Sequence, residues 1–400
     1  MRVSRALSDR RGEMRGSPTD RPGYRDALGP VLGGAERDAR ALGSERVELS
    51  ETRSAAASLT ADSENVLLAV RDIKKHFDVR RGLGRKTRTT VFAVDGVTFE
   101  LNRGETFGLV GESGCGKSTL ARVLAGLYAP TAGTILLRGE DVHAAGARKR
   151  LRGELQMVFQ NPGSSLDPRR RIADSVAEPL IGSSGGKSRN AAALEMLERV
   201  GLEARLQDRF PHQLSGGQQQ RACIARALVA DPALVVLDEA LSSLDVSLQA
   251  QMTTLLNDLQ AQFGCAYVFI THDLATAFQL STRIAIMYLG EIVELLPADA
   301  FHEGTLHPYS RALVEAVLIP DPAIQRHRKH ILLSGDVPSA ASPPSGCRFH
   351  TRCPYVQERC KSERPALAEH GPGHWAACHF AGRLPPRAGD APASDLAGRP

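Results

Sequence analysis

The segment GESGCGKST, residues 111–119, has the residue types and spacing of a loop that binds phosphate. A short apolar strand is expected before it at 105–110, and a helical run follows it, which is the setting in which G-x-x-x-x-G-K-[ST] binds nucleotides. The glycines let backbone N–H groups surround the phosphates, Lys117 reaches the β and γ oxygens, and the Ser118 hydroxyl suits Mg²⁺. The alternative is a glycine turn with an incidental lysine. The candidate contacts are Gly111, Glu112, Ser113, Gly114, Cys115, Gly116, Lys117, Ser118 and Thr119.

Two further apolar runs end in residues that suit phosphate chemistry. ALVVL, 233–237, predicts a parallel strand buried on both faces, and Asp238 follows it at the end where a Mg²⁺ ligand is expected. Glu239 is placed to polarise an attacking water, although two surface acids are the alternative. The strand YVFIT ends before His272, which we interpret as a γ-phosphate sensor in preference to a structural histidine.

A second anion site is indicated by LSGGQQQR, residues 214–221. The paired glycines precede a helical run, so backbone N–H groups and the positive end of a helix face outward together. This site has no lysine of its own, unlike the loop at 111–119. The candidate contacts are Ser215, Gly216, Gly217 and Gln218.

Composition narrows the class of protein. The chain has 400 residues, of which 42% are hydrophobic, and a net charge of +5, which allows a sizeable core and more than one domain. The longest apolar runs are far shorter than the roughly 20 residues that span a bilayer, and no secretory signal is evident, so we expect a cytosolic protein. The basic clusters at 148–152 and 169–171 lack the interleaved aromatic residues of a nucleic-acid platform, and we interpret them as solvated surface.

The motifs occur in a specific order: the phosphate loop, Gln160 in LQMVFQNP, LSGGQ, the strand before Asp238 and Glu239, SSLD, and His272. Together they resemble the ATP-binding subunit of an ABC transporter, over about Val66 to Glu294. The resemblance implies an α/β fold of the P-loop NTPase type, with a parallel-sheet core, an antiparallel β subdomain and a helical subdomain. It also implies that two such domains pack head to tail, each ATP lying between one phosphate loop and the other LSGGQ. In that arrangement the phosphate loop of one domain already supplies a lysine to the ATP, which explains why the LSGGQ of the other domain has none of its own.

The resemblance assigns further roles by position. Phe77 is similar to the aromatic residue that stacks on adenine, although a core phenylalanine is the alternative. Gln160 matches the glutamine that senses Mg²⁺ and water, and Asp245 in SSLD matches the residue that links the two active sites. Glu239 matches the general base and His272 the switch histidine. The sequence DEA departs from many relatives after the acids, but at no catalytic atom.

Residues beyond the ATPase motifs point to a subclass. NPGSSLDPRRR, 161–171, resembles the helical subdomain of oligopeptide, dipeptide and nickel importers, where a membrane partner docks, and a helix is expected from RRRIADSV. LHPYSRAL, 306–313, resembles the HPY element of the same group, although a proline turn before a helix is the alternative. The resemblance therefore implies two permease subunits as partners, a second ATPase subunit that is a paralogue rather than a copy, and an indirect link to an extracytoplasmic solute-binding protein.

The chain is accordingly divided into four parts. Residues 1–63 are expected to be a disordered extension, because they contain few residues that could bury apolar surface. Residues 64–300 form the nucleotide-binding domain, with the helical subdomain at about 161–222. Residues 301–382, called the C-terminal extension below, contain a cysteine cluster, and 383–400 form a flexible tail.

Four cysteines are clustered near the C-terminus: Cys347, Cys353, Cys360 and Cys378, with 5, 6 and 17 residues between them. In a cytosolic chain such a cluster favours metal binding over disulfides. The spacings are looser than the close pairs of zinc sites. Resemblance to the dipeptide-importer extension implies a [4Fe–4S] cluster; zinc, and reduced thiols in a small apolar core, are the alternatives. His350, His374 and His379 are competing ligands, and nothing in the sequence places this cluster near the ATP site.

The sequence thus predicts the ATP- and Mg²⁺-dependent subunit of an importer for oligopeptides, dipeptides or a related solute, peripheral on the cytoplasmic face of the membrane. A soluble repair ATPase is disfavoured because Lys117 and Ser215 are only 98 positions apart, with no room for a long coiled coil. A translation ATPase would usually carry two cassettes, and an exporter would more often have fused membrane helices. A nucleic-acid-binding zinc module at the C-terminus would need a basic and aromatic face, so no nucleic-acid partner is expected.

Overall fold

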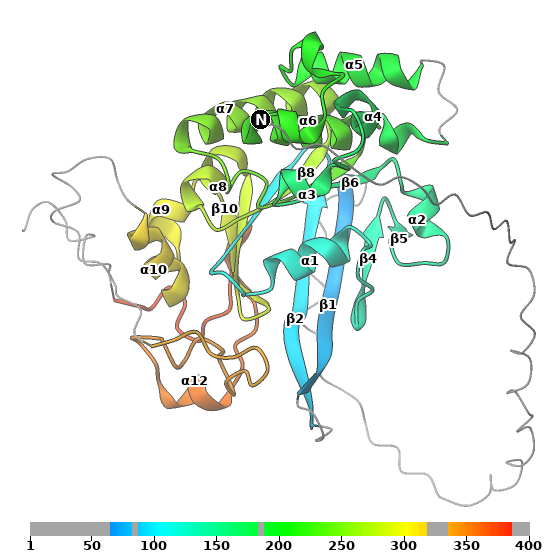
Figure 1. The fold of residues 1–400 in the computed structure, drawn as a ribbon. Coiled ribbons are helices and arrows are strands. Elements are labelled where there is room, and N and C mark those ends of the chain that lie inside the picture. The colour runs from blue at the N-terminus through cyan, green and yellow to red at the C-terminus, as the bar shows by residue number, and fades with distance from the viewer. Residues whose placement is uncertain (1–64, 82–86, 183–187, 318–334, 386–400) are drawn as a thin grey trace, which may run out of the picture. The chain divides into compact units, whose positions relative to one another are not determined.

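The computed structural model describes residues 65–81, 87–182, 188–317 and 335–385 (Figure 1). The extension expected at 1–63 and residues 386–400 of the expected tail lie outside them. The strands are β1 Val66–Arg81, β2 Thr87–Asn102, β3 Thr106–Val110, β4 Ala132–Leu137, β5 Glu140–Asp141, β6 Leu155–Val158, β7 Leu234–Asp238, β8 Ala266–Thr271, β9 Arg283–Tyr288, β10 Glu291–Pro297, β11 Ala368–Gly371 and β12 His374–Ala376. The α-helices are α1 Lys117–Leu124, α2 Ala147–Arg150, α3 Pro162–Ser165, α4 Ile172–Val176, α5 Arg189–Arg199, α6 Gly216–Leu228, α7 Val246–Phe263, α8 Leu274–Leu280, α9 Phe301–Gly304, α10 Pro308–Ala316 and α12 Glu358–Ser362.

The central sheet brings the predicted strands together. Its order within the described residues is β11-β12-β10-β9-β3-β8-β7-β6. Strands β6, β7, β8, β3 and β9 run parallel to one another, whereas β10 pairs antiparallel with β9. The strands expected before the phosphate loop, before Asp238 and before His272 are β3, β7 and β8, which lie side by side. Because they are parallel, their carboxyl ends meet at one edge, which is where an open α/β sheet binds its ligands.

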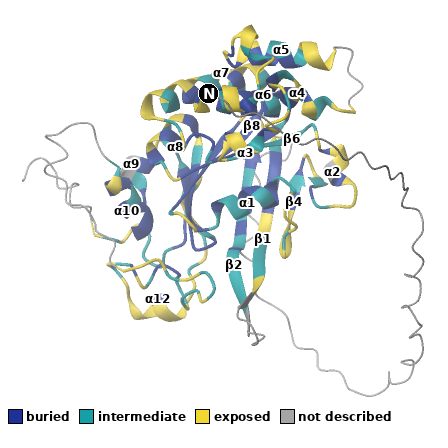
Figure 2. Ribbon diagram, in the orientation of Figure 1, coloured by how far each residue is buried: buried dark blue, intermediate teal, exposed yellow. Residues whose placement is uncertain are grey.

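Both faces of this sheet are covered. Side chains alternate along β8: Val268 and Ile270 belong to one buried cluster with α1, whereas Tyr267 and Phe269 belong to another with α6 and α7. Every residue of β8 is buried, and Figure 2 shows the strands of the sheet in dark blue between the helices. A strand buried on both faces explains why the sequence shows continuous apolar runs rather than alternation.

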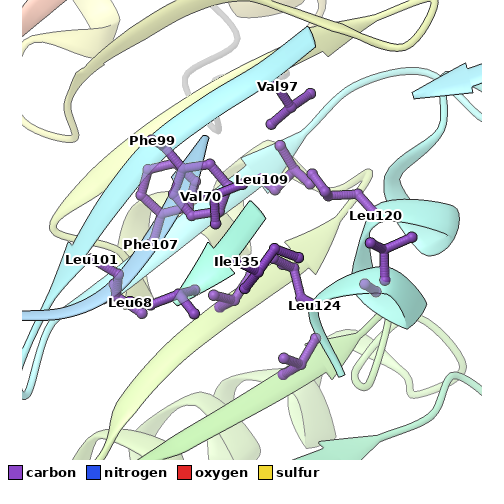
Figure 3. Packing of buried hydrophobic residues seen from close by; sticks show 14 of the residues in the cluster. Leu68, Val70, Val97, Phe99, Leu101, Phe107, Leu109, Leu120, Leu124 and Ile135 are labelled. Atoms are coloured by element: carbon purple, nitrogen blue, oxygen red, sulfur yellow. The ribbon is translucent and has the colours of Figure 1, made fainter. Parts of the chain in front are cut away.

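A separate antiparallel sheet, of order β2-β1-β4-β5, packs on the phosphate-loop side of the core. Phe99 of β2 stacks on Phe107 of β3, with ring centroids 4.3 Å apart and planes 9° from parallel. Leu120 and Leu124 of α1 complete the same cluster, which Figure 3 shows from close by. The packing fixes the loop between β3 and α1 from both ends.

Helices α4, α5 and α6 pack on one another and share a second core with α7 and the strands β7 and β8. The helix expected from RRRIADSV begins only at Ile172, because Arg171 has extended backbone angles (φ −68°, ψ 157°). The arginines before it are instead exposed or partly exposed. These elements form an α/β fold with one mixed sheet and one antiparallel sheet, whereas the division into domains stays a prediction.

The C-terminal extension joins the central sheet. Strand β12 pairs with β10 through Glu294 with Ala376 and Leu295 with Trp375, and β11 pairs with β12. Glu294 is fully buried and accepts hydrogen bonds from the backbone N–H groups of Leu306 and His307, while His374 lies 2.7 Å from its carboxylate. The extension is therefore attached to the core by backbone pairing and by a buried carboxylate.

We predict that Phe107→Ala lowers the free energy of unfolding by about 3–5 kcal/mol, because it leaves a cavity beneath Phe99 in a fully buried cluster. Urea denaturation of the purified chain measures this. Val246→Ala is the control, since Val246 is 82% exposed and its truncation should change the stability little. Equal stability of the two variants would contradict the packing described.

Candidate active site

The phosphate loop lies between β3 and α1, as the sequence predicts. Gly116 has φ +111°, and a Cβ on it would lie 2.1 Å from the carbonyl oxygen of Ala93, so only glycine fits there. Lys117 is buried, and its Nζ donates to the carbonyl oxygens of Gly111 (2.8 Å) and Glu112 (3.0 Å). The charge of the lysine is thus held by the backbone of the loop, in position to turn toward an anion.

The other loop residues differ in exposure. Ser113 and Gly114 are exposed, whereas the thiol of Cys115 is buried 3.9 Å from the Lys117 Nζ, and burial raises the pKa of that thiol. Ser118 and Thr119 are half-buried in the first turn of α1. The open side of the loop is therefore Ser113–Gly114, and the N-terminus of α1 faces the same place.

Asp238 ends β7 beside the loop. The Ser118 hydroxyl donates to its Oδ1 at 2.9 Å, and Asp238 is only 2% exposed. Burial raises the pKa of Asp238, and the hydrogen bond from Ser118 offsets only part of that effect. A buried carboxylate next to a hydroxyl is a donor pair that suits a hard divalent cation, which would also remove the cost of burying the charge. The two side chains fit Mg²⁺.

Glu239 brings two predicted residues together. Gln160 Nε2 donates to Glu239 Oε2 at 2.8 Å, and His272 Nδ1 lies 3.5 Å from the same oxygen. Glu239 has φ +49°, a backbone conformation that costs a non-glycine residue free energy and is common at functional sites. The Glu239 N–H donates to the Ile270 carbonyl oxygen, and the Glu239 carbonyl oxygen accepts from the Ser242 hydroxyl. These two hydrogen bonds hold the strained backbone of Glu239 in place.

The LSGGQ residues begin α6. Ser215 is the N-cap: its hydroxyl accepts from the Gln218 N–H at 3.3 Å, and the Gln218 side chain accepts from the Ser215 N–H at 3.0 Å. Ser215 and Gly216 are exposed, Gly217 is buried, and in the described chain no hydrogen bond joins them to residues 111–119. The start of α6 faces outward, as predicted. In the described residues it makes no hydrogen bond to the phosphate loop of the same chain.

Asp245 is exposed and caps α7, accepting from the Leu248 N–H at 2.9 Å. It lies six residues beyond Glu239, in a loop where the Ser242 hydroxyl donates to the Glu239 carbonyl oxygen and the Gln249 side chain donates to that of Leu241. Its side chain therefore makes a local cap, and its predicted role between two active sites stays a prediction.

Phe77 lies outside the buried clusters. It is half-buried on β1, makes an edge contact with Tyr128 at 5.9 Å, and has Lys75 Nζ 5.0 Å from its ring centroid. Tyr128 is 38% exposed, and the guanidinium of Arg122 lies 5.9 Å from its ring. These aromatic faces form a platform suited to a nucleobase, and the sequence reasoning missed Tyr128, whose only signal was an aromatic residue just after α1.

The C-terminal extension contributes two contacts that the sequence gave no reason to expect. The Tyr309 hydroxyl accepts from the Glu112 N–H at 3.0 Å, and Arg352 donates to both carboxylate oxygens of Glu112 at 2.9 and 3.2 Å. The segment between Cys347 and Cys353 therefore lies against the phosphate loop. No local pattern could signal this, because these partners are 197 and 240 positions apart.

The four clustered cysteines line one cavity of about 20 Å³, together with His350 and His379. Burial raises the pKa of the Cys347 thiol to about 12 and that of Cys353 to about 11, and the neighbouring thiols add to the effect. His374 is turned to Glu294 instead. Within the described ranges, no three of the Cys, His, Asp and Glu side chains are arranged to hold a metal ion. The thiols converge, but as arranged they do not form a ligand set.

No α-helix within the described residues is both long enough and apolar enough to cross a bilayer.

Comparisons with known proteins agree with this geometry. The family model "ABC transporter" matches residues 94–242, and the model "Oligopeptide/dipeptide transporter, C-terminal region" matches residues 293–360. The first match contains the phosphate loop, LSGGQ and Asp238–Glu239, and the second contains the HPY element and three of the clustered cysteines.

Among curated proteins, the chain is 44% identical to the oligopeptide transport ATP-binding protein AppF of Bacillus subtilis, over 80% of this chain and 99% of that protein. It is 45% identical to the oligopeptide transport ATP-binding protein OppF of Salmonella typhimurium, over 76% and 94% of the two chains. It is also 46% identical to the di/tripeptide transport ATP-binding protein DppF of Pseudomonas aeruginosa, over 75% and 94%.

Among solved structures, a dimeric post-hydrolysis state of the ATP-binding cassette MJ0796 bound to ADP and Pi is similar, with 29% identity and a TM-score of 0.51. The match covers 58% of this chain and 98% of that one. The cbiO1 protein of Clostridium perfringens, part of the transporter complex cbiONQ, gives the same TM-score at 25% identity, over 59% and 90% of the two chains.

We predict that Lys117→Ala weakens nucleotide binding by about tenfold or more, because a charge-assisted contact to the phosphates is lost. Equilibrium titration of the purified chain with a fluorescent ATP analogue measures this. Lys149→Ala is the matched control, since Lys149 is exposed on α2 away from the loop. If Lys117→Ala bound the analogue as tightly as the wild type, the assignment of residues 111–119 as the phosphate-binding loop would be wrong.

Proposed function

The chain belongs to the family of ABC transporter ATP-binding proteins, and from that membership we propose that it powers the import of oligopeptides or dipeptides through a membrane complex. It is an ATPase that couples ATP hydrolysis to transport. Its relatives act on oligopeptides, dipeptides and tripeptides by name, and its C-terminal extension matches the model of that group. Peripheral attachment to a membrane, at its cytoplasmic face, follows from the same proposal.

The observation that carries the proposal is the convergence on Glu239. Its carboxylate meets Gln160 and His272, next to the Ser118–Asp238 pair and the phosphate loop. Mg²⁺, when bound by Ser118 and Asp238, would neutralise charge on the triphosphate. Glu239 accepts a proton from the attacking water, Gln160 orients that water, and His272 contacts the γ-phosphate. Lys117 and the N–H groups of α1 hold the phosphates, and Phe77 with Tyr128 stacks on the adenine.

The exposed start of α6 supports a two-cassette arrangement. Ser215, Gly216 and Gln218 present donors with no anion of their own, and one LSGGQ can complete the ATP site of another cassette. The two sites then close together, with Asp245 beside the interface, and ATP favours the closed state by contacts that exist only there. A paralogous ATPase is the proposed partner in preference to a second copy. The dimeric cassette MJ0796 is a precedent for two cassettes pairing, whether they are copies or paralogues.

A groove between the helical subdomain and the core suits a permease. It has a volume of about 360 Å³ and is lined by Leu127, Met157, Phe159, Pro179 and Arg226, among others. Leu127 is 39% exposed, and Phe159 directly precedes Gln160. An amphipathic helix from a cytoplasmic loop of each of two permeases would bury this apolar lining next to the residue that contacts Glu239. A solute-binding protein then acts through the permeases.

We propose that a [4Fe–4S] cluster is bound by Cys347, Cys353, Cys360 and Cys378. A zinc ion, or a small core of reduced thiols, is the alternative. The convergence of four thiols on one cavity supports a shared ligand. The thiols would have to move closer together, since their present arrangement is not a ligand set. No step of ATP hydrolysis is assigned to the cluster.

We predict that Glu239→Gln lowers ATP hydrolysis by at least about 100-fold while nucleotide binding persists, because the amide cannot accept the proton. Hydrolysis and peptide uptake are measured in the assembled transporter, with nucleotide retention as a second readout. Glu358→Gln serves as the control, since that acid is 88% exposed on α12 and pairs with the neighbouring Lys361. Near-normal turnover in Glu239→Gln would refute the base assignment.

If the cluster is present, we predict about four iron atoms and about four acid-labile sulfides per chain in anaerobically purified protein. Cys360→Ser, which changes a buried thiol, should then lose both. Zinc without sulfide would select the first alternative. Neither metal, with all seven cysteines reactive as thiols after unfolding, would select the second.

A further inference from the structure

The C-terminal extension holds the side chain of Glu112, the second residue of the phosphate loop. Arg352 donates Nη1 to Oε2 at 2.9 Å and Nη2 to Oε1 at 3.2 Å, which is a two-point contact. The Arg352 side chain is only 8% exposed, and that of Glu112 is 27% exposed. Such fork-to-carboxylate pairs fix orientation as well as distance, and partial burial limits their screening by salt.

The backbone of Glu112 is held as well. Its N–H donates to the hydroxyl of Tyr309, a fully buried residue of α10 in the HPY element, and its carbonyl oxygen accepts from the Lys117 Nζ at 3.0 Å. Glu112 is therefore fixed on three sides: by Arg352, by Tyr309 and by the lysine that binds phosphate. A displacement of Glu112 must move the oxygen that orients Lys117.

A second arginine of the same segment supports the loop from its other end. Arg348 is 8% exposed, donates to the carbonyl oxygen of Leu289 and pairs with Glu291 and Asp95. The next residue in that turn, Gly290, donates its N–H to the carbonyl oxygen of Cys115 at 2.8 Å. Arg348 and Arg352 thus reach the phosphate loop by two separate routes.

We propose that Arg352 is a positioning residue for ATP, which acts through Glu112 to hold the phosphate loop in the geometry that binds the triphosphate. A loop that converges several N–H groups on one anion loses backbone freedom when it binds, and the extension removes that freedom in advance. Without Arg352 the loop explores other conformations, and the free energy of binding must include the cost of ordering it. Neither the ATPase motifs nor the thiol cluster assigns this role.

The experiment measures the dissociation constant of a nonhydrolysable ATP analogue with the full chain carrying Arg352→Ala, Arg352→Lys or Arg359→Ala. Arg359→Ala is the matched control, because Arg359 lies in the same extension, is 59% exposed and pairs only locally with Glu363. We expect Arg352→Ala to raise the dissociation constant about fivefold or more. Arg352→Lys should have an intermediate effect, since it keeps the charge but not the fork.

A double-mutant cycle with Glu112→Ala separates positioning from a general loss of structure. If Arg352 acts through Glu112, the double variant should bind no more weakly than the weaker single variant. Tyr309→Phe removes only the hydroxyl and should also weaken binding. Tyr267→Phe is its control, because it deletes a buried hydroxyl bonded to the Leu256 carbonyl oxygen, away from the loop.

Thermal unfolding of each variant shows whether the fold is intact. If Arg352→Ala does not fold, the nucleotide affinities of the single variants Arg352→Lys and Tyr309→Phe test the proposal in its place. Wild-type affinity in Arg352→Ala would overturn the proposal. So would single effects that multiply in the double variant, since Arg352 would then act independently of Glu112.

Discussion

The concentrated negative charge of a triphosphate is the constraint on which the rest of this structure depends. A protein can meet that charge only where positive groups converge and little water competes for them. Here the buried Lys117, the N-terminus of α1 and the hydrogen-bonded side chains of Ser118 and Asp238 lie at one edge of a parallel sheet. The sheet, the helices that cover it and the aromatic platform all follow from the need to hold these groups without a ligand present.

Holding these groups in place costs free energy. Glu239 has a strained backbone, Asp238 is a carboxylate buried with one hydroxyl donor, and Lys117 is bonded to its own loop. Lys117 and Asp238 carry the charges that a triphosphate and its divalent cation would meet. The binding free energy of the nucleotide is therefore available to change conformation, which is what a transport ATPase needs.

Sequence reasoning predicted the parts of the site that lie at strand ends and in the glycine loop. GESGCGKST, Asp238 and His272 each follow an apolar run, and a parallel sheet must bring such ends together. It missed Tyr128, and it had no access to the contacts of Tyr309 and Arg352 with Glu112. Those depend on how the extension docks, and docking between segments so distant in the chain leaves no periodicity to detect. The first residue of α4 was also missed, because a backbone turn at Arg171 decided it.

The pairing of β12 with β10 has a consequence for how the polypeptide is built. Without β12 the edge of β10 would offer unpaired N–H and C=O groups to any passing chain, a recognised route to aggregation. The extension therefore covers the backbone of β10 at Glu294 and Leu295 and moves the edge of the sheet outward to the short strand β11.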